Sequence, residues 1–195
     1  MELYIARHGE TEGNAAGQLQ GSGRDTPLTA KGIEQAKSLG KSLKNMDFDA
    51  IYSSPLKRAT DTARIALNDE TLFNLHGFTD KRLVEIGVGD AEGMDWHEAA
   101  LKFPSFGRLM TNPSTYIPPA NGETLPDMIA RIDSFLQELA TKPYSRVFVL
   151  AHGYVLRVVY ACTQNKSPTA IAQAPVYDNC ALVRYTYNGT KWEPK

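Results

Sequence analysis

Short apolar runs alternate along this chain with longer segments in which apolar residues recur every three or four positions. The clearest runs are residues 3–6, 48–52 and 147–151, and each has the length of a buried strand. Two of the longer segments start at a hydroxyl residue that can cap a helix, Thr29 and Thr124. Strands that alternate with helices predict an α/β fold, namely a three-layer αβα sandwich in which helices cover both faces of a mostly parallel central sheet.

Shorter signals predict the remaining elements of this sandwich. Ser54-Pro55 is typical of a helix start, a capping hydroxyl followed by proline, so we expect a helix from about Pro55 to Leu67. The other expected elements are a weaker strand over 72–75, a helix over 154–162, and a terminal β-hairpin formed by 181–187, Asn188-Gly189 and Trp192.

Composition excludes several classes of protein. With 195 residues, of which 42% are hydrophobic and 22% charged, the chain fits one globular domain, which we place at 1–195, and is neither disordered nor collagen-like. Its net charge of -1 argues against a general nucleic-acid binder. Two cysteines, no basic N-terminal signal region and no long apolar run predict a soluble cytoplasmic protein without a membrane partner. The oligomeric state is left open, a homodimer included.

Residues 94–120 fit the alternating pattern poorly. This segment combines several aromatic and methionine side chains with the pair Pro118-Pro119. We expect a partly helical insertion, and two interpretations stay open: a small cap over a functional site, or an extra segment that covers the core.

Polar side chains follow three of the predicted strands. His8 ends the first strand, the turn from Ser53 to Arg58 follows the second, and His152 ends the strand 147–151. Ligands of open parallel sheets bind beyond the carboxyl ends of the strands, so these groups converge if the strands are neighbours. Arg7 and Arg58 then favour a phosphate, because guanidinium matches phosphate oxygens. Half-buried structural histidines and solvated surface arginines are the alternative.

Several blocks of sequence point to one family. They include Arg7-His8-Gly9-Glu10-Thr11 with Asn14, Pro27-Leu28-Thr29, Ser53 to Ala59, Leu83 to Ile86, Gly122-Glu123-Thr124 and Ala151-His152-Gly153. In this order, spread over residues 3 to about 160, they resemble the histidine phosphatase superfamily, also called the phosphoglycerate mutase-like family.

The resemblance implies a role for each matching residue. His8 would be the nucleophile that takes the phosphoryl group, and Glu85 would be the proton donor. The residues that would bind the substrate are Arg7, Asn14, Gln20, Gly21, Arg58, His152 and Gly153; among these, Arg7, Arg58 and His152 would also act in catalysis. The family needs no metal for this chemistry, and no cofactor is expected.

Elementary chemistry agrees with these assignments. A free imidazole has a pKa near ~6.5 and is largely neutral at pH 7, and two nearby arginines would disfavour the protonated form of His8 further. Phosphoryl transfer needs mainly positioning and charge stabilisation, which Arg7, Arg58 and a positively charged His152 would supply.

Within the family, the sequence favours a phosphatase over a cofactor-dependent phosphoglycerate mutase. Only 66 residues, 86–151, separate Glu85 from His152, whereas such mutases carry a longer segment with extra basic residues. Residues 86–123 hold five acidic and two basic side chains, a poor clamp for a bisphosphorylated acid. The expected substrate is a small phosphomonoester.

Two functions from other classes remain as alternatives. A non-catalytic phosphate-binding module on the same fold would be expected to lose His8 or Glu85, and this chain has both. A metal hydrolase could use the four histidines His8, His76, His97 and His152, but these lack a local ligand spacing such as His-x-x-x-His.

Overall fold

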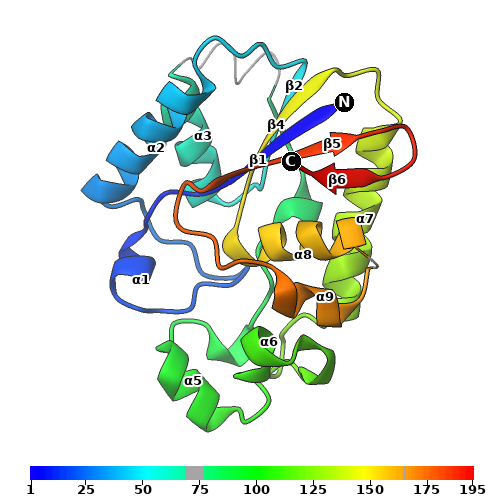
Figure 1. Ribbon diagram of the computed structural model, residues 1–195. Helices are drawn as coiled ribbons and strands as arrows, with labels where there is room; N and C mark the ends of the chain where they lie inside the picture. The colour runs from blue at the N-terminus through cyan, green and yellow to red at the C-terminus, as the bar shows by residue number, and fades with distance from the viewer. Residues whose placement is uncertain (69–76, 165) are drawn as a thin grey trace.

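A computed structural model of the chain describes residues 1–68, 77–164 and 166–195, and in these residues strands and helices alternate (Figure 1). The strands are β1 (Glu2–Arg7), β2 (Ala50–Ser53), β3 (Gly77–Thr79), β4 (Arg146–Ala151), β5 (Leu182–Tyr187) and β6 (Trp192–Pro194). Within the described ranges they form one sheet in the order β3-β2-β4-β1-β5-β6. The pairs β1–β4, β4–β2 and β2–β3 are parallel, and β5 and β6 join antiparallel at one edge. The predicted, mostly parallel sheet is confirmed.

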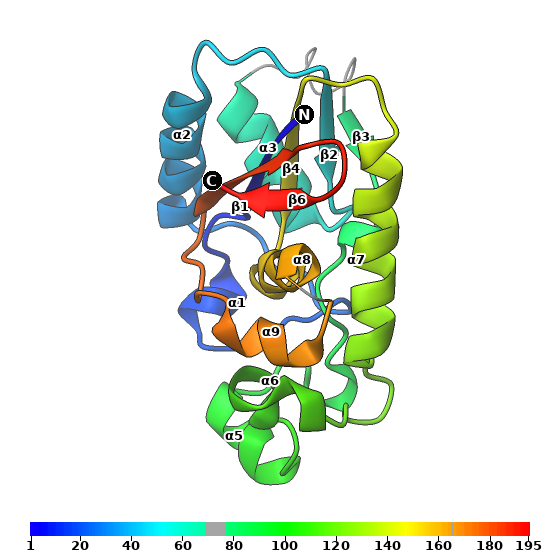
Figure 2. The same ribbon diagram turned by 45° about the vertical axis from the view of Figure 1, so that its right-hand side comes forward.

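Helices cover both faces of this sheet, as predicted for a three-layer sandwich. The α-helices are α1 (Glu12–Ala15), α2 (Ala30–Leu43), α3 (Lys57–Leu67), α5 (Trp96–Lys102), α6 (Arg108–Thr111), α7 (Leu125–Ala140), α8 (Gly153–Gln164) and α9 (Pro168–Gln173). Short 3-10 turns lie at Lys81–Leu83, Gly89–Ala91 and Pro113–Thr115. The two views show α2 and α3 on one face of the sheet and α7 and α8 on the other (Figure 2).

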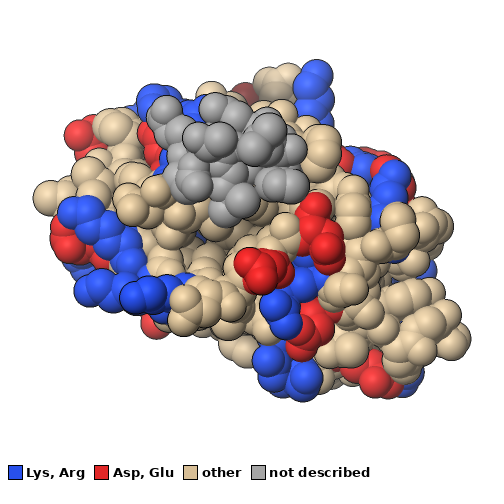
Figure 3. Space-filling model, turned by 90° about the horizontal axis from the view of Figure 1, so that it is seen from above, with Lys and Arg blue, Asp and Glu red and all other residues tan. Residues whose placement is uncertain are grey.

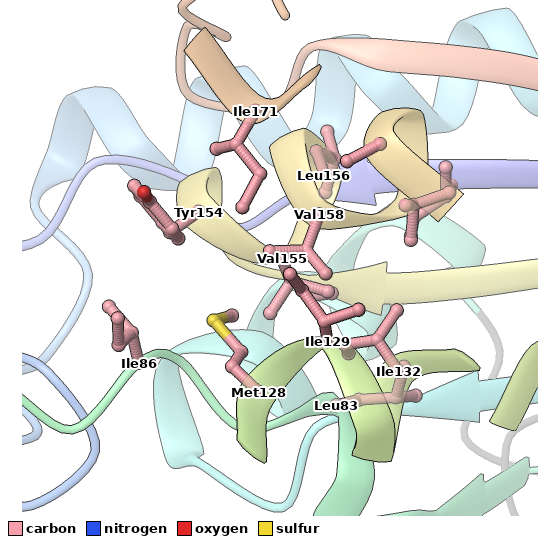
Figure 4. Close-up of a cluster of buried hydrophobic side chains, with 14 of the residues drawn as sticks. Leu83, Ile86, Met128, Ile129, Ile132, Tyr154, Val155, Leu156, Val158 and Ile171 are labelled. Atoms are coloured by element: carbon pink, nitrogen blue, oxygen red, sulfur yellow. The ribbon is translucent and has the colours of Figure 1, made fainter. Parts of the chain in front are cut away.

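The core has two parts because the central strands are buried on both faces. In β1, Leu3 and Ile5 belong to the cluster with α7 and α8, whereas Tyr4 and Ala6 belong to the cluster with α2 and α3. This is the alternation that a strand imposes on its side chains. In the first cluster, Ile129 and Ile132 of α7 lie toward Val155 and Val158 of α8 (Figure 4). The core fixes α8 against the sheet, and α8 begins directly after His152.

Two of the three predicted helix starts are confirmed and one is wrong. The Thr29 hydroxyl accepts a hydrogen bond from the backbone N–H of Gly32, and Thr124 accepts one from Asp127. Ser54-Pro55 does not begin a helix: α3 starts at Lys57, and its N-cap Leu56 has no capping side chain. The Ser54 hydroxyl instead lies 2.7 Å from Nε2 of His152 and accepts from the Leu56 N–H, so it belongs to a turn.

The chain ends in the predicted hairpin, in which β5 and β6 pair antiparallel. The predicted strand 72–75 lies outside the described residues, and β3 at 77–79 is the neighbour of β2. From above, Lys and Arg side chains are mixed with Asp and Glu over the visible surface (Figure 3), as the small net charge leads one to expect. Among the helices that the structure describes, none is both long and apolar enough to cross a bilayer.

Residues 94–120 contain α5, α6 and a 3-10 turn, which confirms that the segment is partly helical. It lies beyond α8 and α9, at the end of the molecule opposite to the chain termini (Figures 1 and 2). Phe106 and Leu109 are buried and belong to the larger core cluster. The Tyr154 hydroxyl of α8 donates a 2.8 Å hydrogen bond to the carbonyl oxygen of Leu109, so the segment is attached to the helix that follows His152.

Candidate active site

The carboxyl ends of β1, β2 and β4 meet at one edge of the sheet because these strands are parallel neighbours. The ladder continues one step past β1, where the N–H of His8 donates to the carbonyl of Ala151 at 3.0 Å. His8 and His152 therefore lie side by side, with ring centroids 5.2 Å apart in an edge-to-face arrangement. The convergence predicted from the sequence is confirmed.

A cavity of about 240 Å³ opens beside this pair of histidines. Eight of the nine predicted site residues line it: Arg7, His8, Asn14, Gln20, Gly21, Arg58, Glu85 and Gly153. The ninth, His152, lies behind His8 and is fully buried. Residues from strand ends and from loops thus meet at one site.

His8 presents a neutral imidazole to the cavity. Its Nδ1 lies 2.7 Å from the carbonyl oxygen of Gly9, and because a carbonyl can only accept, Nδ1 carries the proton. Nε2 is then the basic nitrogen of the ring. Burial, together with the charges of Arg58 and Arg7, holds the pKa of His8 well below its usual value. The ring is therefore uncharged at neutral pH and its Nε2 lone pair is free, as a nitrogen nucleophile requires.

His152 differs from the sequence prediction, which gave it a positive charge. Nε of Arg58 donates to Nδ1 of His152 at 3.3 Å, so Nδ1 is an acceptor and Nε2 donates to the Ser54 hydroxyl. Burial and the neighbouring Arg58 hold the pKa of His152 well below its usual value. Both ring nitrogens are engaged by the protein, and burial next to the positively charged Arg58 keeps His152 neutral.

Arg58 is almost completely buried, with 1% of its side chain exposed. Its Nη2 donates to the carbonyl of Gly21 at 2.8 Å, and its Nη1 donates to Oδ1 of Asp25 at 3.0 Å. Together with the bond to His152, these contacts fix the guanidinium in one orientation against the cavity. A buried, oriented guanidinium is a strong donor for an anion.

Asp25 was not singled out from the sequence, although it supports this arginine. Its carboxylate pairs with the Arg58 guanidinium and also accepts the backbone N–H groups of Lys57 and Arg58. It therefore caps α3, which has no capping side chain of its own. An acidic residue in a loop more than 30 positions upstream gives no local helix signal, so sequence reasoning could not place it.

Arg7 approaches the cavity from the end of β1. Its Nη1 donates to the carbonyl of Tyr177 at 2.7 Å, and its buried Nε has no hydrogen-bond partner among the described residues. A Cβ on Gly153 would lie 3.4 Å from that Nε, so the first residue of α8 packs closely against Arg7. Burial lowers the pKa of Arg7, while the nearby Glu85 opposes the shift. An unpartnered guanidinium N–H in this place suits an anionic ligand.

Glu85 also lines the cavity, near Arg7. Its two carboxylate oxygens accept backbone N–H groups, Oε1 from Ile86 at 3.0 Å and Oε2 from Tyr154 at 3.2 Å. The second contact lies in the first turn of α8, where free N–H groups favour an acidic side chain. The half-buried carboxyl group is thereby oriented at the cavity.

The loop after α1 contributes Gln20 and Gly21, as predicted, but through the backbone more than through side chains. The Gln20 amide is used within the loop, because Nε2 donates to Thr11 and Oε1 accepts from Thr26. Gly21 adopts a positive φ of 55°, and a Cβ there would lie 2.4 Å from Oε1 of Glu92. Glycine is favoured at this position, because a side chain would be strained at this φ and would have to displace the Glu92 carboxylate.

Asn14 and its neighbour Asn179 join the two ends of the chain at the site. Nδ2 of Asn179 donates to the carbonyl of His8 at 3.0 Å and to Oδ1 of Asn14 at 3.3 Å. Asn179 was missed because it lies in a loop without a recognisable pattern. A second missed residue is Arg157, a buried arginine of α8 that lines the cavity. The sequence did contain a signal for Arg157, because this residue is a charged side chain within the apolar run of a buried helix.

The far wall of the cavity is apolar. It is formed largely by residues 94–120, which contribute Trp96, Phe106, Leu109 and Met110. The two basic residues of this segment, Lys102 of α5 and Arg108 of α6, do not line the cavity. The site thus has a charged floor at the sheet edge and an apolar wall opposite.

Among the described histidines considered for a metal site, His8 and His152 lie side by side, but His97 is not near them. His97 is exposed on α5 and does not line the cavity, and His76 lies outside the described residues. Among the described residues, no three His, Cys, Asp or Glu side chains are arranged to hold a metal ion.

Fold and site define a class: an open α/β sheet whose parallel strand ends carry a buried histidine pair and two arginines, arranged to bind an anion. The particular family follows from the sequence. The model of the histidine phosphatase superfamily (branch 1) matches residues 3–195, and the chain belongs to that family. The resemblance stated from these blocks of sequence is confirmed.

Similar proteins carry more than one activity in their names. The chain is 34% identical over 179 residues to a metal-independent phosphoserine phosphatase of Arabidopsis thaliana, covering 90% of this chain and 74% of that protein. It is 33% identical over 174 residues to a 2,3-bisphosphoglycerate-dependent phosphoglycerate mutase of Azorhizobium caulinodans, covering 87% and 84%. The solved structure of Bacillus stearothermophilus YhfR superposes with a TM-score of 0.88 at 30% identity, covering 99% of this chain and 94% of that one.

Proposed function

We propose that the protein is a metal-independent phosphatase that hydrolyses small phosphomonoesters through a phosphohistidine on His8. The observation that carries this proposal is the state of the His8 ring: its proton is held on Nδ1 by Gly9, and Nε2 is free of protein donors in the described contacts. Arg7 and Arg58 line the same cavity, where they can hold the phosphate. Phosphatases and a mutase among the relatives agree with phosphoryl transfer as the reaction class.

In the first step, Nε2 of His8 attacks phosphorus in line with the ester oxygen. The N–P bond forms as the P–O bond breaks, and Glu85 gives its proton to the leaving alkoxide. The guanidinium groups of Arg7 and Arg58 offset the charge on the equatorial oxygens. The products of this step are the free alcohol and phospho-His8.

In the second step, a water molecule attacks the phosphohistidine. Glu85, now ionised, takes a proton from this water as the new P–O bond forms and the N–P bond breaks. Inorganic phosphate leaves, and both His8 and Glu85 return to their starting states. His8 and Glu85 return every proton and electron pair that they exchange, so the ester and one water molecule are the reactants of the whole cycle.

The apolar wall favours hydrolysis over mutase chemistry. A mutase must hold a second anionic group while the first is exchanged, whereas the insertion 94–120 offers Trp96 and Phe106 at this wall and no Lys or Arg. This also supports the insertion as a cap that selects the ester group within one domain. A cytoplasmic location belongs to the same proposal, supported by the free thiols Cys162 and Cys180.

The test is trapping of the intermediate. Enzyme quenched during turnover of p-nitrophenyl phosphate should carry acid-labile phosphate on His8 by mass spectrometry, and His8→Ala should lose nearly all phosphate release while remaining folded. His97→Ala is the matched control, since it removes an exposed histidine outside the cavity. Near-normal activity of folded His8→Ala would overturn the proposal, and activity that a chelator abolishes would favour a metal hydrolase.

A further inference from the structure

The stretch of chain that carries Glu85 has little regular structure of its own. Residues 84–88 lie between the 3-10 turns at Lys81–Leu83 and Gly89–Ala91, and they join a neighbouring segment in one isolated bridge, from Val88 to Gly122. No helix or strand among the described elements includes Glu85. The place of its carboxyl group at the cavity therefore depends on contacts that come from outside this stretch.

Arg131 of α7 makes such a contact before Glu85 in the sequence. Its Nη1 donates to the carbonyl oxygen of Arg82, three residues upstream of Glu85. Its Nε and Nη2 donate to the two carboxylate oxygens of Glu123, at 2.6 and 2.8 Å. This bidentate ion pair is partly shielded from water, because the two side chains are only 19% and 21% exposed. One guanidinium thus binds the chain before Glu85 and the carboxylate of Glu123 together.

Glu123 makes the matching contact after Glu85. Its backbone N–H donates to the carbonyl oxygen of Gly87 at 2.7 Å, and its Oε2 accepts the N–H of Gly87 at 3.4 Å. Gly87 follows Glu85 by two residues. Glu85, Glu123 and Arg131 also line a common second cavity of about 390 Å³, so the ion pair lies beside Glu85 in space as well as on both sides of it in the sequence.

We propose that Arg131 and Glu123 are positioning residues, which hold Glu85 at the catalytic cavity by fixing the chain before and after it. The inference rests on the proposed function, since it bears on the reaction only if Glu85 is the proton donor. Neither residue lines the catalytic cavity, so both act through Glu85. A proton donor must lie within hydrogen-bond reach of the leaving oxygen, and a displacement of about 1 Å is enough to slow such a step strongly.

Two esters with different leaving groups test this role. The alkoxide that leaves glycerol 3-phosphate needs a proton from Glu85, whereas p-nitrophenolate needs it much less. Arg131→Met removes the donors and keeps a good helix former in α7. It should lower the first-turnover rate on glycerol 3-phosphate by about tenfold and that on p-nitrophenyl phosphate by about threefold at most. Arg131→Lys, which keeps the charge but not the fork, should lose less.

Arg82→Met is the matched control. The Arg82 side chain joins the same stretch to α7 through an ion pair with Glu138, and its substitution leaves the carbonyl group that Arg131 binds. This variant should leave the ratio of the two first-turnover rates unchanged, and Arg131→Met should not change the ratio further in Glu85→Gln. An unchanged ratio in Arg131→Met, an equal change in Arg82→Met, or a further change in the Glu85→Gln background overturns the inference.

Hydrogen exchange tests the positioning without the reaction. The N–H of Tyr154 donates to Oε2 of Glu85 at 3.2 Å, and it lies in the first turn of α8, where an N–H has no acceptor within the helix. Its exchange rate by NMR, taken relative to that of Val159 in the middle of α8, should rise by about tenfold in Arg131→Met and stay unchanged in Arg82→Met. The reference to Val159 removes any loss of stability that affects the whole helix.

The two measurements separate failure of the inference from failure of the proposed function. If the wild type hydrolyses neither ester, or if Glu85→Gln lowers both first-turnover rates equally, the proposed function fails and exchange at Tyr154 alone decides the inference. Faster relative exchange in Arg131→Met but not in Arg82→Met supports the positioning of Glu85. A relative rate that is unchanged, or equally raised in both variants, overturns it.

Discussion

The two buried histidines should make the stability of the protein depend on pH between about 7.5 and 5.5. Burial, Arg58 and Arg7 hold the pKa of His8 well below its usual value, and burial and Arg58 do the same for His152. In the unfolded chain both rings regain a pKa near ~6.5. Below that pH the unfolded chain binds two protons that the folded protein does not, so the free energy of unfolding falls as the pH falls.

The size of this effect follows from the number of protons. One proton of difference changes the free energy of unfolding by about 1.4 kcal/mol per pH unit once the unfolded histidine is protonated. For His8 and His152 together, the loss between pH 7.5 and 5.5 is about 2.7 kcal/mol, a substantial part of the roughly 5–15 kcal/mol typical of a domain. The loss continues at lower pH until the folded pKa values are reached.

Urea unfolding followed by circular dichroism at pH 7.5, 6.5 and 5.5 measures this loss. The buffers must be free of phosphate, because an anion that binds only the folded state would stabilise it. His8→Asn removes one of the two groups and should lower the loss to about 1.4 kcal/mol. His97→Asn, which replaces an exposed histidine, is the control.

Two results would refute the reasoning. One is a wild-type loss well under about 1 kcal/mol, which would mean that the folded protein takes up the same protons as the unfolded chain. The other is an equal loss in His8→Asn and the wild type, which would mean that His8 is not held neutral. Either result would also remove the physical basis for His8 as an unprotonated nucleophile.

Other predictions concern the groups around these histidines. Glu85→Gln should lower the first-turnover rate by about 10²–10⁴-fold on an alkyl phosphate and by less on p-nitrophenyl phosphate, and equal losses in a burst-phase measurement would exclude Glu85 as the acid. Asp25→Asn should raise KM by about tenfold, because Arg58 loses its charged partner; an unchanged KM would show that Arg58 holds its place without it. Trp96→Ala should change the relative kcat/KM of bulky and small phosphomonoesters, whereas Leu101→Ala, exposed on the same segment, should not.

Local patterns were enough to predict most of the fold. A buried strand and a capped amphipathic helix depend on near neighbours in the sequence, so β1, β4 and the helix caps at Thr29 and Thr124 could be read directly. The start of α3 could not, because its cap comes from Asp25 in a distant loop. The sequence there contains a common start signal, Ser54-Pro55, which the folded chain uses for a turn.

The sequence predicted which residues form the candidate site, but it did not predict the protonation state of each one. Strand ends and family blocks located Arg7, His8, Arg58 and Glu85, which all line the cavity. The neutral charge of His152 depends on burial and on its bonds to Arg58 and Ser54, and these are properties of the folded protein only. For this reason the sequence could indicate a histidine at the phosphate but not its protonation.

The backbone hydrogen bond from His8 to Ala151 has a consequence for how such a protein can diversify. Neighbouring strands lie about 4.8 Å apart, and this bond extends their ladder to the two histidines, so the spacing of the imidazoles is set by the sheet itself. The apolar wall, in contrast, is carried by residues 94–120, which are attached to α8 by a side-chain bond from Tyr154. If residues 94–120 were exchanged for the matching segment of a relative, the shape of the apolar wall would change while the two histidines kept their separation. Substrate recognition can therefore change in evolution without a change in the reacting groups.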